Sequence, residues 1–446
     1  MPAAAESAHN LSPFAYRGFA LYLMARATGV IATEMLSVAV AWQVYEITRK
    51  PLNLGLVGLA QFFPGVLLFL LAGHVADRFA RKRTLVGCYL AYAFCAALLL
   101  HLAMAQVSVV APIYLAVTMV GVVRTFDGPV RTSLLTELVP DKVFPTAVAL
   151  HGSFNKAAQM TGPMLGGLIY AASGGPRLVY LGGLIGFAIA VAAAIPLPGR
   201  VRSVMPETVL RPGFALPNGR PAGRDLRTLL AGLRYIREHR IVLGAISLDL
   251  FAVLLGGAVA LLPVYARDIL KTGPWGLGLL RAAPGIGATI MGAVVAHRSL
   301  RKNVGALMLW CVALFGATTV VFGLSRNLWL SLAALLVLGA SDMVSVIVRQ
   351  TVVQVATPDE MRGRVSAVNM LFIGTSNQLG EFESGLTAAW FGTVPAVVLG
   401  GIGSLVVVAI WAWVFPELRK VNQLTAEELR HTTLMNEAPT PLASQD

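Results

Sequence analysis

The stretch GHVADRFARKR, residues 73–83, decides the fold of this chain. It joins two apolar runs, 54–76 and 84–105, and each has the ~20 residues that a helix needs to cross a bilayer. Backbone groups cannot remain unpaired in hydrocarbon, so such runs must be helices. The stretch therefore predicts a pair of membrane-spanning helices joined by a basic loop.

The same alternation continues along the chain. Of its 446 residues 56% are hydrophobic and only 13% are charged, against about 25% charged in a soluble domain. We predict an all-α membrane protein with twelve transmembrane helices in two pseudo-symmetric six-helix bundles. The expected spans are 18–46, 54–76, 84–105, 108–130, 147–172, 178–197, 241–266, 276–297, 304–324, 328–353, 365–390 and 395–415.

Two polar segments interrupt this series of spans. We expect four parts: an N-terminal bundle, a cytoplasmic linker, a C-terminal bundle and a cytoplasmic tail, at 1–197, 198–240, 241–415 and 416–446. Within the linker, LRTLLAGLRYIREHR (226–240) places Leu and Ile at helical spacing between Arg and Glu. That pattern predicts an amphipathic helix on the membrane surface.

Most Lys and Arg residues lie in one set of loops. DRFARKR (77–83), RSLRKN (298–303), DEMRGR (359–364) and the linker are rich in them, whereas alternate loops such as QVSV (106–109) are not. The positive-inside rule then places both termini in the cytoplasm. It also accounts for the net charge of +13. No basic patch is interleaved with aromatic residues, so we expect no nucleic-acid partner.

The two halves repeat at a nearly constant offset. Shifting by 218 residues places Gly121 on Gly339 and Gly162 on Gly380. Shifting by 220 places Val44-Tyr45 on Val264-Tyr265. Parallel repeats of this kind are typical of transporters with a central site between the halves.

The loop at 73–83 resembles the signature loop of the major facilitator superfamily, G-x-x-x-D-R-x-G-R-K, with Ala80 at the second Gly. The resemblance implies a conformational latch that stabilises the outward-open state. Its residues would be Gly73, Asp77, Arg78, Arg81 and Lys82. In the second half His297 stands where Asp77 would be, so we expect the main latch in the first half. A plain positive-inside anchor is the alternative.

Two further segments carry the resemblance. Arg124-Thr-Phe-Asp127-Gly128 is similar to the R-x-x-Q-G element, which implies a role in proton coupling; a structural ion pair is the alternative. The segment at 158–167 is similar to the antiporter motif G-x-x-x-G-P-x-x-G-G, with Ala158 at the first Gly; a packing seam of small residues is the alternative. The antiporter-like residues are Gly162, Pro163, Gly166 and Gly167. Together with WQVYEIT (42–48), the pattern resembles the branch of drug and siderophore exporters.

Ionisable residues inside spans are functional candidates because they are costly there. Glu34 is our first choice for proton coupling, and Asp249 is its approximate counterpart in the second half. The proton-coupling candidates are Glu34, Asp127, Glu381, Asp249 and Asp342. The cavity or charge-pair candidates are Arg26, Arg124, Arg281, Arg349 and Glu383. Arg124 and Arg131 each lie about one turn from Asp127, so local pairing is one option. For each carboxylate a buried structural pair is the alternative.

Catalysis and cofactors are not expected. The sequence has no Walker-type or H-E-x-x-H motif, and Cys88, Cys95 and Cys311 lie inside apolar spans, where small core residues are more common than metal ligands. We expect no metal and no cofactor.

We therefore predict a monomeric, proton-coupled exporter of a small amphipathic, drug-like or siderophore-like molecule in the bacterial inner membrane, working by alternating access. Its partners would be the substrate, protons and the bilayer. An importer or uniporter, a lysolipid flippase, and a non-transporting receptor on the same fold are the alternatives.

Overall fold

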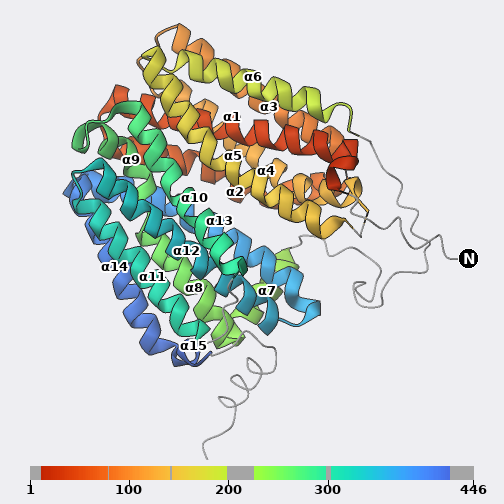
Figure 1. Cartoon of the computed structure of the whole chain (residues 1–446), viewed down its shortest axis with the longest axis vertical. Helices are drawn as coiled ribbons and strands as arrows, with labels where there is room; N and C mark the ends of the chain where they lie inside the picture. The colour runs from red at the N-terminus through yellow and green to blue at the C-terminus, as the bar shows by residue number, and fades with distance from the viewer. Residues whose placement is uncertain (1–11, 79, 141–142, 198–225, 298–302, 422–446) are drawn as a thin grey trace, which may run out of the picture. The chain divides into compact units, whose positions relative to one another are not determined.

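The computed structural model describes residues 12–78, 80–140, 143–197, 226–297 and 303–421. Within these ranges the side chains at 69–70, 72–78, 129, 131–133, 136–137, 226–229, 359 and 420 are not described. The described chain is helical (Figure 1). Its first helices are η1 (Pro13–Ala15), α1 (Arg17–Thr48), α2 (Pro51–Arg78), α3 (Arg81–Met104), α4 (Ala111–Leu138), α5 (Phe144–Ser173) and α6 (Arg177–Ala194).

The later helices begin with the linker helix α7 (Leu226–Glu238). They continue as α8 (Arg240–Leu255), η3 (Ala258–Leu261), α9 (Leu262–Val264), η4 (Tyr265–Ile269), α10 (Gly273–His297), α11 (Val304–Leu324), α12 (Leu328–Ala356), α13 (Asp359–Phe391), α14 (Thr393–Val414) and α15 (Pro416–Lys420). Counting α8 to η4 as one interrupted span, the described residues contain the twelve expected transmembrane helices, which confirms the predicted fold class.

Nine stretches in the described part of the chain are long and apolar enough to cross a membrane by composition alone. The three long helices that fall short are α4, α5 and α13. These carry polar residues in mid-helix, such as Asp127, Asn155 and Glu381. Polar groups at that depth must face protein or water rather than lipid.

The seventh span differs from the prediction of one continuous helix over 241–266. Helix α8 ends at Leu255, a 3-10 turn follows Gly256-Gly257, and Tyr265–Ile269 forms a π-helix. The break occurs where Gly257 packs against the backbone of α13: a Cβ there would lie 2.4 Å from the Gly380 carbonyl oxygen. Only glycine permits that approach.

The chain packs as two compact units. The first comprises residues 1–210 and 262–282, and the second comprises residues 211–261 and 283–446. The segment Leu262–Ala282, which the predicted boundary assigns to the C-terminal bundle, thus packs with the first unit. The reason lies in polar contacts at the end of α1, described below.

Equivalent glycines make equivalent contacts in the two halves. A Cβ on Gly162 of α5 would lie 3.0 Å from the Ile31 carbonyl oxygen of α1, and one on Gly380 of α13 would lie 3.0 Å from the Val253 carbonyl oxygen of α8. The 218–220-residue repeat seen in the sequence therefore matches a packing repeat.

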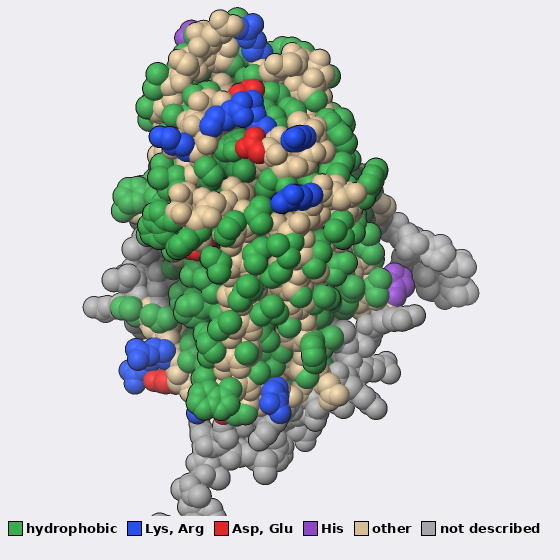
Figure 2. Space-filling model, turned by 90° about the vertical axis from the view of Figure 1, so that its left-hand side faces the viewer, with side chains coloured by type: hydrophobic (Ala, Val, Ile, Leu, Met, Phe, Trp, Pro, Cys, Tyr) green, Lys and Arg blue, Asp and Glu red, His purple; other side chains and the backbone are tan. Residues whose placement is uncertain are grey.

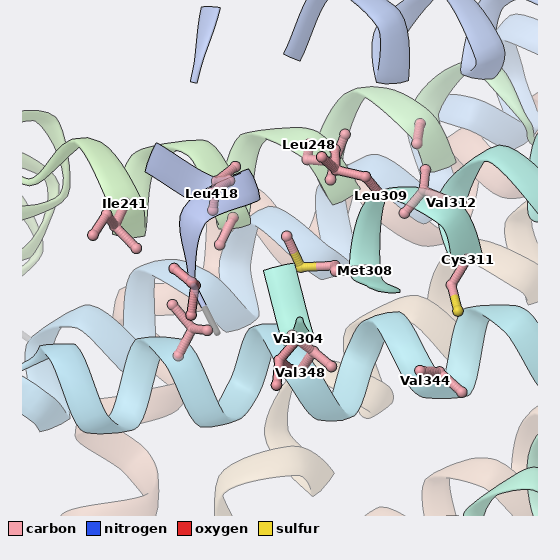
Figure 3. Packing of buried hydrophobic residues seen from close by; sticks show 14 of the residues in the cluster. Ile241, Leu248, Val304, Met308, Leu309, Cys311, Val312, Val344, Val348 and Leu418 are labelled. Carbon is pink, nitrogen blue, oxygen red and sulfur yellow. The ribbon is translucent and has the colours of Figure 1, made fainter. Parts of the chain in front are cut away.

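The second unit has a hydrophobic core shared by α8, α11, α12, α14 and α15 (Figure 3). Met308 and Val312 of α11 lie between Leu248 of α8 and Val348 of α12. Along the chain Asp249 directly follows Leu248, and Arg349 directly follows Val348. This core therefore fixes the place of a buried charge pair.

The surface agrees with a membrane environment. Figure 2 shows a face on which hydrophobic side chains cover a broad band, with Lys and Arg gathered toward its ends. In the second unit four tryptophans are strongly exposed near helix ends: Trp310, Trp329, Trp390 and Trp413. Exposed tryptophan at helix ends is typical of the two membrane–water interfaces.

Candidate functional site

A buried ion pair joins α1 to α4 in the first unit. Arg26 Nη1 lies 3.4 Å from Asp127 Oδ2, and both side chains are almost fully buried. The two residues are 101 positions apart, so the pairing is tertiary rather than local. Arg26, one of the charge-pair candidates, thus lies against Asp127 across two helices.

Aromatic side chains surround the Arg26 guanidinium. Tyr89 of α3 lies beside it, and so does Tyr22, one turn earlier on α1. The Tyr22 ring packs against the His151 ring of α5 at a centroid distance of 5.4 Å, with the two planes tilted by 30°. Sequence reasoning missed His151, although a histidine in a transmembrane helix was a usable signal.

The register of α1 and α5 brings a further polar residue to this level. Tyr22 meets His151, and Ile31 meets Gly162, so the two helices run parallel and Arg26 lies level with Asn155. The Asn155 side-chain oxygen is buried with no hydrogen-bond donor among the described residues. The first unit thus holds polar groups in addition to its ion pair.

The second unit carries an ion pair of reversed polarity. Asp249 on α8 accepts a hydrogen bond from Arg349 on α12, and both side chains are buried. Helices α8 and α12 are the repeat equivalents of α1 and α4, so each unit bridges its first and fourth spans with one buried pair. In the first the arginine is on the first span; in the second it is on the fourth.

Glu34 occupies a different position from the paired residues. Its Cβ packs on Gly162 of the antiporter-like segment, where an added Cβ would approach within 2.5 Å. The carboxylate is half-buried, and no hydrogen bond or ion pair joins it to a residue that the structure describes. Gly380 contacts the backbone of Val253 and Leu254 as Gly162 contacts that of Ile31, so the position of Glu34, three residues further along its helix, corresponds to the Gly256-Gly257 break rather than to Asp249.

The other antiporter-like residues form a tight seam. Gly166 approaches the Met35 backbone of α1, and Gly167 approaches the Pro274 carbonyl oxygen of α10, where a Cβ would lie at 2.5 Å. Pro163 lies inside α5, and its carbonyl oxygen would be 2.6 Å from a Cβ on Gly278. These residues let three helices meet at backbone distance.

The remaining arginines of the first unit differ in their contacts. Arg124 is exposed and makes no ion pair with a described residue, so local pairing with Asp127 does not occur. Arg131 is in α4, and its side chain is outside the described set. Arg281 donates a hydrogen bond to the Ser37 hydroxyl of α1, at 2.8 Å.

The carboxylates of α12 and α13 are half-buried. Glu383 accepts a hydrogen bond from the Thr387 hydroxyl at 2.6 Å. Glu381 and Asp342 are also half-buried. Arg349, seven residues from Asp342 on the same face, pairs with Asp249 instead.

A network at the end of α1 holds the Leu262–Ala282 segment. Arg267 lies 3.4 Å from Glu46, and Asp268 lies 3.7 Å from Arg49. The Tyr45 hydroxyl donates to Asp268, and the Arg267 guanidinium lies 5.5 Å from the Trp42 ring centroid. Each repeat thus supplies one acid and one base to two crossed ion pairs. The sequence showed the Val-Tyr repeat at this place but not the pairing.

The predicted latch lies at the turn from α2 to α3. The side chains of Gly73, Asp77 and Arg78 are outside the described set. Arg81 and Lys82 are half-buried in the first turn of α3. The latch role therefore stays a prediction.

Metal binding has no support among the described residues, where no group of three or more His, Cys, Asp or Glu side chains is placed to hold an ion. The three cysteines are buried thiols. What the described groups can do is hold charge, exchange a proton and provide polar surface within helical bundles.

Comparison with known proteins gives concordant results. The family model for transmembrane secretion effectors matches residues 8–441. The enterobactin exporter EntS of Escherichia coli O1:K1 / APEC is 25% identical over 414 residues, covering 91% of this chain and 93% of that protein. The same exporter of Shigella boydii serotype 4 is 25% identical over 412 residues, with the same shares covered.

Solved structures share the fold. A bacterial homologue of the human lysosomal transporter Spinster matches with a TM-score of 0.65 and 14% identity, over 97% of this chain and 100% of that one. The nucleoside transporter NupG matches with a TM-score of 0.63 and 13% identity, over 89% of this chain and 99% of that one.

Proposed function

Because the chain belongs to the transmembrane secretion effector family of the major facilitator superfamily, we propose that it exports a small amphipathic molecule, drug-like or siderophore-like, in exchange for protons. One observation carries the direction of transport: the similarity to enterobactin exporters extends over 91% of this chain. The same relatives, named as exporters of enterobactin, support the siderophore-like substrate.

Glu34 is the proposed proton carrier. Asp127 and Asp249 are each held by an arginine, and Glu383 by a threonine hydroxyl, whereas the Glu34 carboxylate is without a partner among the described residues. A carboxylate in such a place can hold a proton or assist a substrate, but not both at once. This competition couples the two fluxes.

The two buried ion pairs have a different role in this mechanism. Each ties the first span of a repeat to the fourth, so each unit moves as a rigid body. Alternating access then consists of rocking between rigid halves, as in other transporters built from repeats. The crossed ion pairs at the end of α1 lie inside the first unit and hold the Leu262–Ala282 segment to it during this motion.

Transport in everted membrane vesicles tests the function. Vesicles are loaded by adding amphipathic fluorescent dyes or iron-free siderophores while respiration acidifies the lumen. We expect uptake into the lumen that collapses with a protonophore. Glu34→Gln should abolish this uptake yet retain substrate counterflow, which needs no net proton movement; Glu238→Gln, on the exposed linker helix, is the control.

The alternatives give distinct outcomes. Uptake that depends on the substrate gradient alone, with no effect of the protonophore, indicates a uniporter. Proton-driven movement of the substrate out of the acidic lumen indicates an importer. Competition by lysolipids indicates a flippase, and the absence of any flux indicates a receptor. Full proton-driven transport by Glu34→Gln would move the coupling role to Glu381 or Asp342.

We further propose a monomer in the bacterial inner membrane with both termini in the cytoplasm. The distribution of Lys and Arg supports this orientation. A cysteine introduced at Gln106 should react with an impermeant maleimide added to whole cells, and one introduced at Arg83 should react only after the membrane is opened. The reverse result would invert the topology.

A further inference from the structure

The linker helix α7 has a docked face and an open edge. Ile236 is fully buried against Val242, Val365 and Val368, and a Cβ on Gly232 would lie 2.7 Å from the Arg364 carbonyl oxygen. Figure 1 shows α7 beside α13, in agreement with these contacts. One side of α7 is therefore part of the second unit.

A hydrogen bond also joins α7 to the end of α12. The Tyr235 hydroxyl donates to the Ala356 carbonyl oxygen at 3.0 Å. Burial raises the pKa of Tyr235, which keeps the hydroxyl protonated as a donor. The helix is thus held to the ends of two transmembrane helices.

The open edge combines leucine with arginine. Leu230 is 55% exposed and Leu233 38%, although both are apolar. Arg237 lies seven residues after Leu230, hence on the same edge. Arg234, one turn before Arg237, pairs with Glu238 at 2.8 Å and still has its side chain 81% exposed. Arg237 is exposed and makes no ion pair with a described residue.

Chain connectivity restricts what this edge can meet. Only His239 separates the end of α7 from the start of the transmembrane helix α8 at Arg240. This short connection holds the C-terminal end of α7 at the level where the span begins, next to the membrane surface. Exposed leucines there can enter the acyl boundary while arginines reach phosphate groups.

We propose that the Leu230–Leu233–Arg234–Arg237 edge of α7 binds anionic phospholipid at the membrane surface. With Arg227, Arg234, Arg237 and Glu238, α7 has a formal excess of two positive charges (3 − 1), which matches negatively charged headgroups. Through Gly232 and Tyr235 the bound lipid steadies the ends of α12 and α13. The inference does not depend on the direction of transport.

Native mass spectrometry of the full chain tests the lipid preference. The protein is released from nanodiscs containing equal amounts of phosphatidylglycerol and phosphatidylcholine. We expect retention of phosphatidylglycerol, with affinity about fivefold weaker for each arginine removed in Arg234→Gln and Arg237→Gln. Arg419→Gln, on the exposed surface of α15, is the matched control and should leave retention unchanged.

A spin label placed by Leu230→Cys tests the location. In the same nanodiscs its collisions with oxygen should exceed those with a polar nickel complex, while a label at Glu238→Cys should show the reverse. The proposal is overturned by equal retention in the double arginine variant and the Arg419→Gln control. It is also overturned if the label at Leu230 is as accessible to the nickel complex as the label at Glu238. A label at Leu230 that neither oxygen nor nickel reaches, whatever the charge of the lipid, would overturn it too and would indicate a protein partner.

Discussion

The Arg26 guanidinium lies 3.4 Å from the Asp127 carboxylate, buried between α1 and α4. The second unit holds the same kind of pair with the charges exchanged, because Asp249 is on α8 and Arg349 is on α12. What the repeat preserves is a neutral, buried bridge between its first and fourth spans. Which of the two helices carries the arginine differs between the units.

This relationship predicts that the charges can be exchanged in the first unit too. Asp127→Asn should lower the free energy of unfolding by about 3 kcal/mol, because it leaves the Arg26 charge buried without its partner. The double variant Arg26→Asp with Asp127→Arg should recover most of that loss. Thermal unfolding in detergent measures both. Arg124→Gln, on the same helix but exposed, should unfold like the parent, and an unstable double variant would contradict the bridge.

The contact between Gly162 and Glu34 predicts a steric effect. In Gly162→Ala the new Cβ would approach the Glu34 Cβ to 2.5 Å, so α1 and α5 must separate. We expect a loss of about 1–3 kcal/mol in stability together with slower proton-coupled transport. Gly152→Ala is the matched control, since it adds the same methyl group to α5 with nothing within 4 Å. Equal behaviour of the two variants would show that the seam is not tight.

The crossed ion pairs at the end of α1 predict a local loosening. Asp268→Asn weakens the pair with Arg49 and the hydrogen bond from Tyr45, which are partly exposed to solvent. Hydrogen exchange should therefore rise about fivefold across Leu262–Ala282, corresponding to ~1 kcal/mol. Lys271→Gln removes a charge from the same segment without breaking a described contact. An equal rise in both variants would assign the effect to charge alone.

The loop at 73–83 predicts a change in the resting state. Asp77→Asn should shift the protein toward the inward-open state, because it removes the acid of the loop that stabilises the outward-open state. The equivalent loop of the second half has His297 in place of that acid and cannot compensate. Labelling of a cysteine placed at Glu34, half-buried inside α1, by impermeant maleimides added from each side reports which side is open. Unchanged labelling from both sides would show that the loop is only a topological anchor.

The sequence by itself determined the membrane class, the twelve spans and the repeat. The length of the apolar runs, the charge of the loops and the spacing of Gly162 and Gly380 can be read directly from the sequence. A single segment that crosses hydrocarbon must be a helix, because only a helix pairs all of its own backbone groups. The sequence did not predict the interruption of the seventh span at Gly256-Gly257. Its cause is the close approach of Gly380, which lies 123 positions after Gly257 on another helix.

Only the tertiary structure decided which charges meet. Asp127 has Arg124 one turn away along α4, yet it pairs with Arg26 of α1, and Arg349 pairs with Asp249 rather than with Asp342. Helical spacing shows which residues share a face but not which neighbour that face meets. That orientation is set by glycine seams that fix how closely and at what rotation helices pack, so the pairing of buried charges is a property of the folded chain alone.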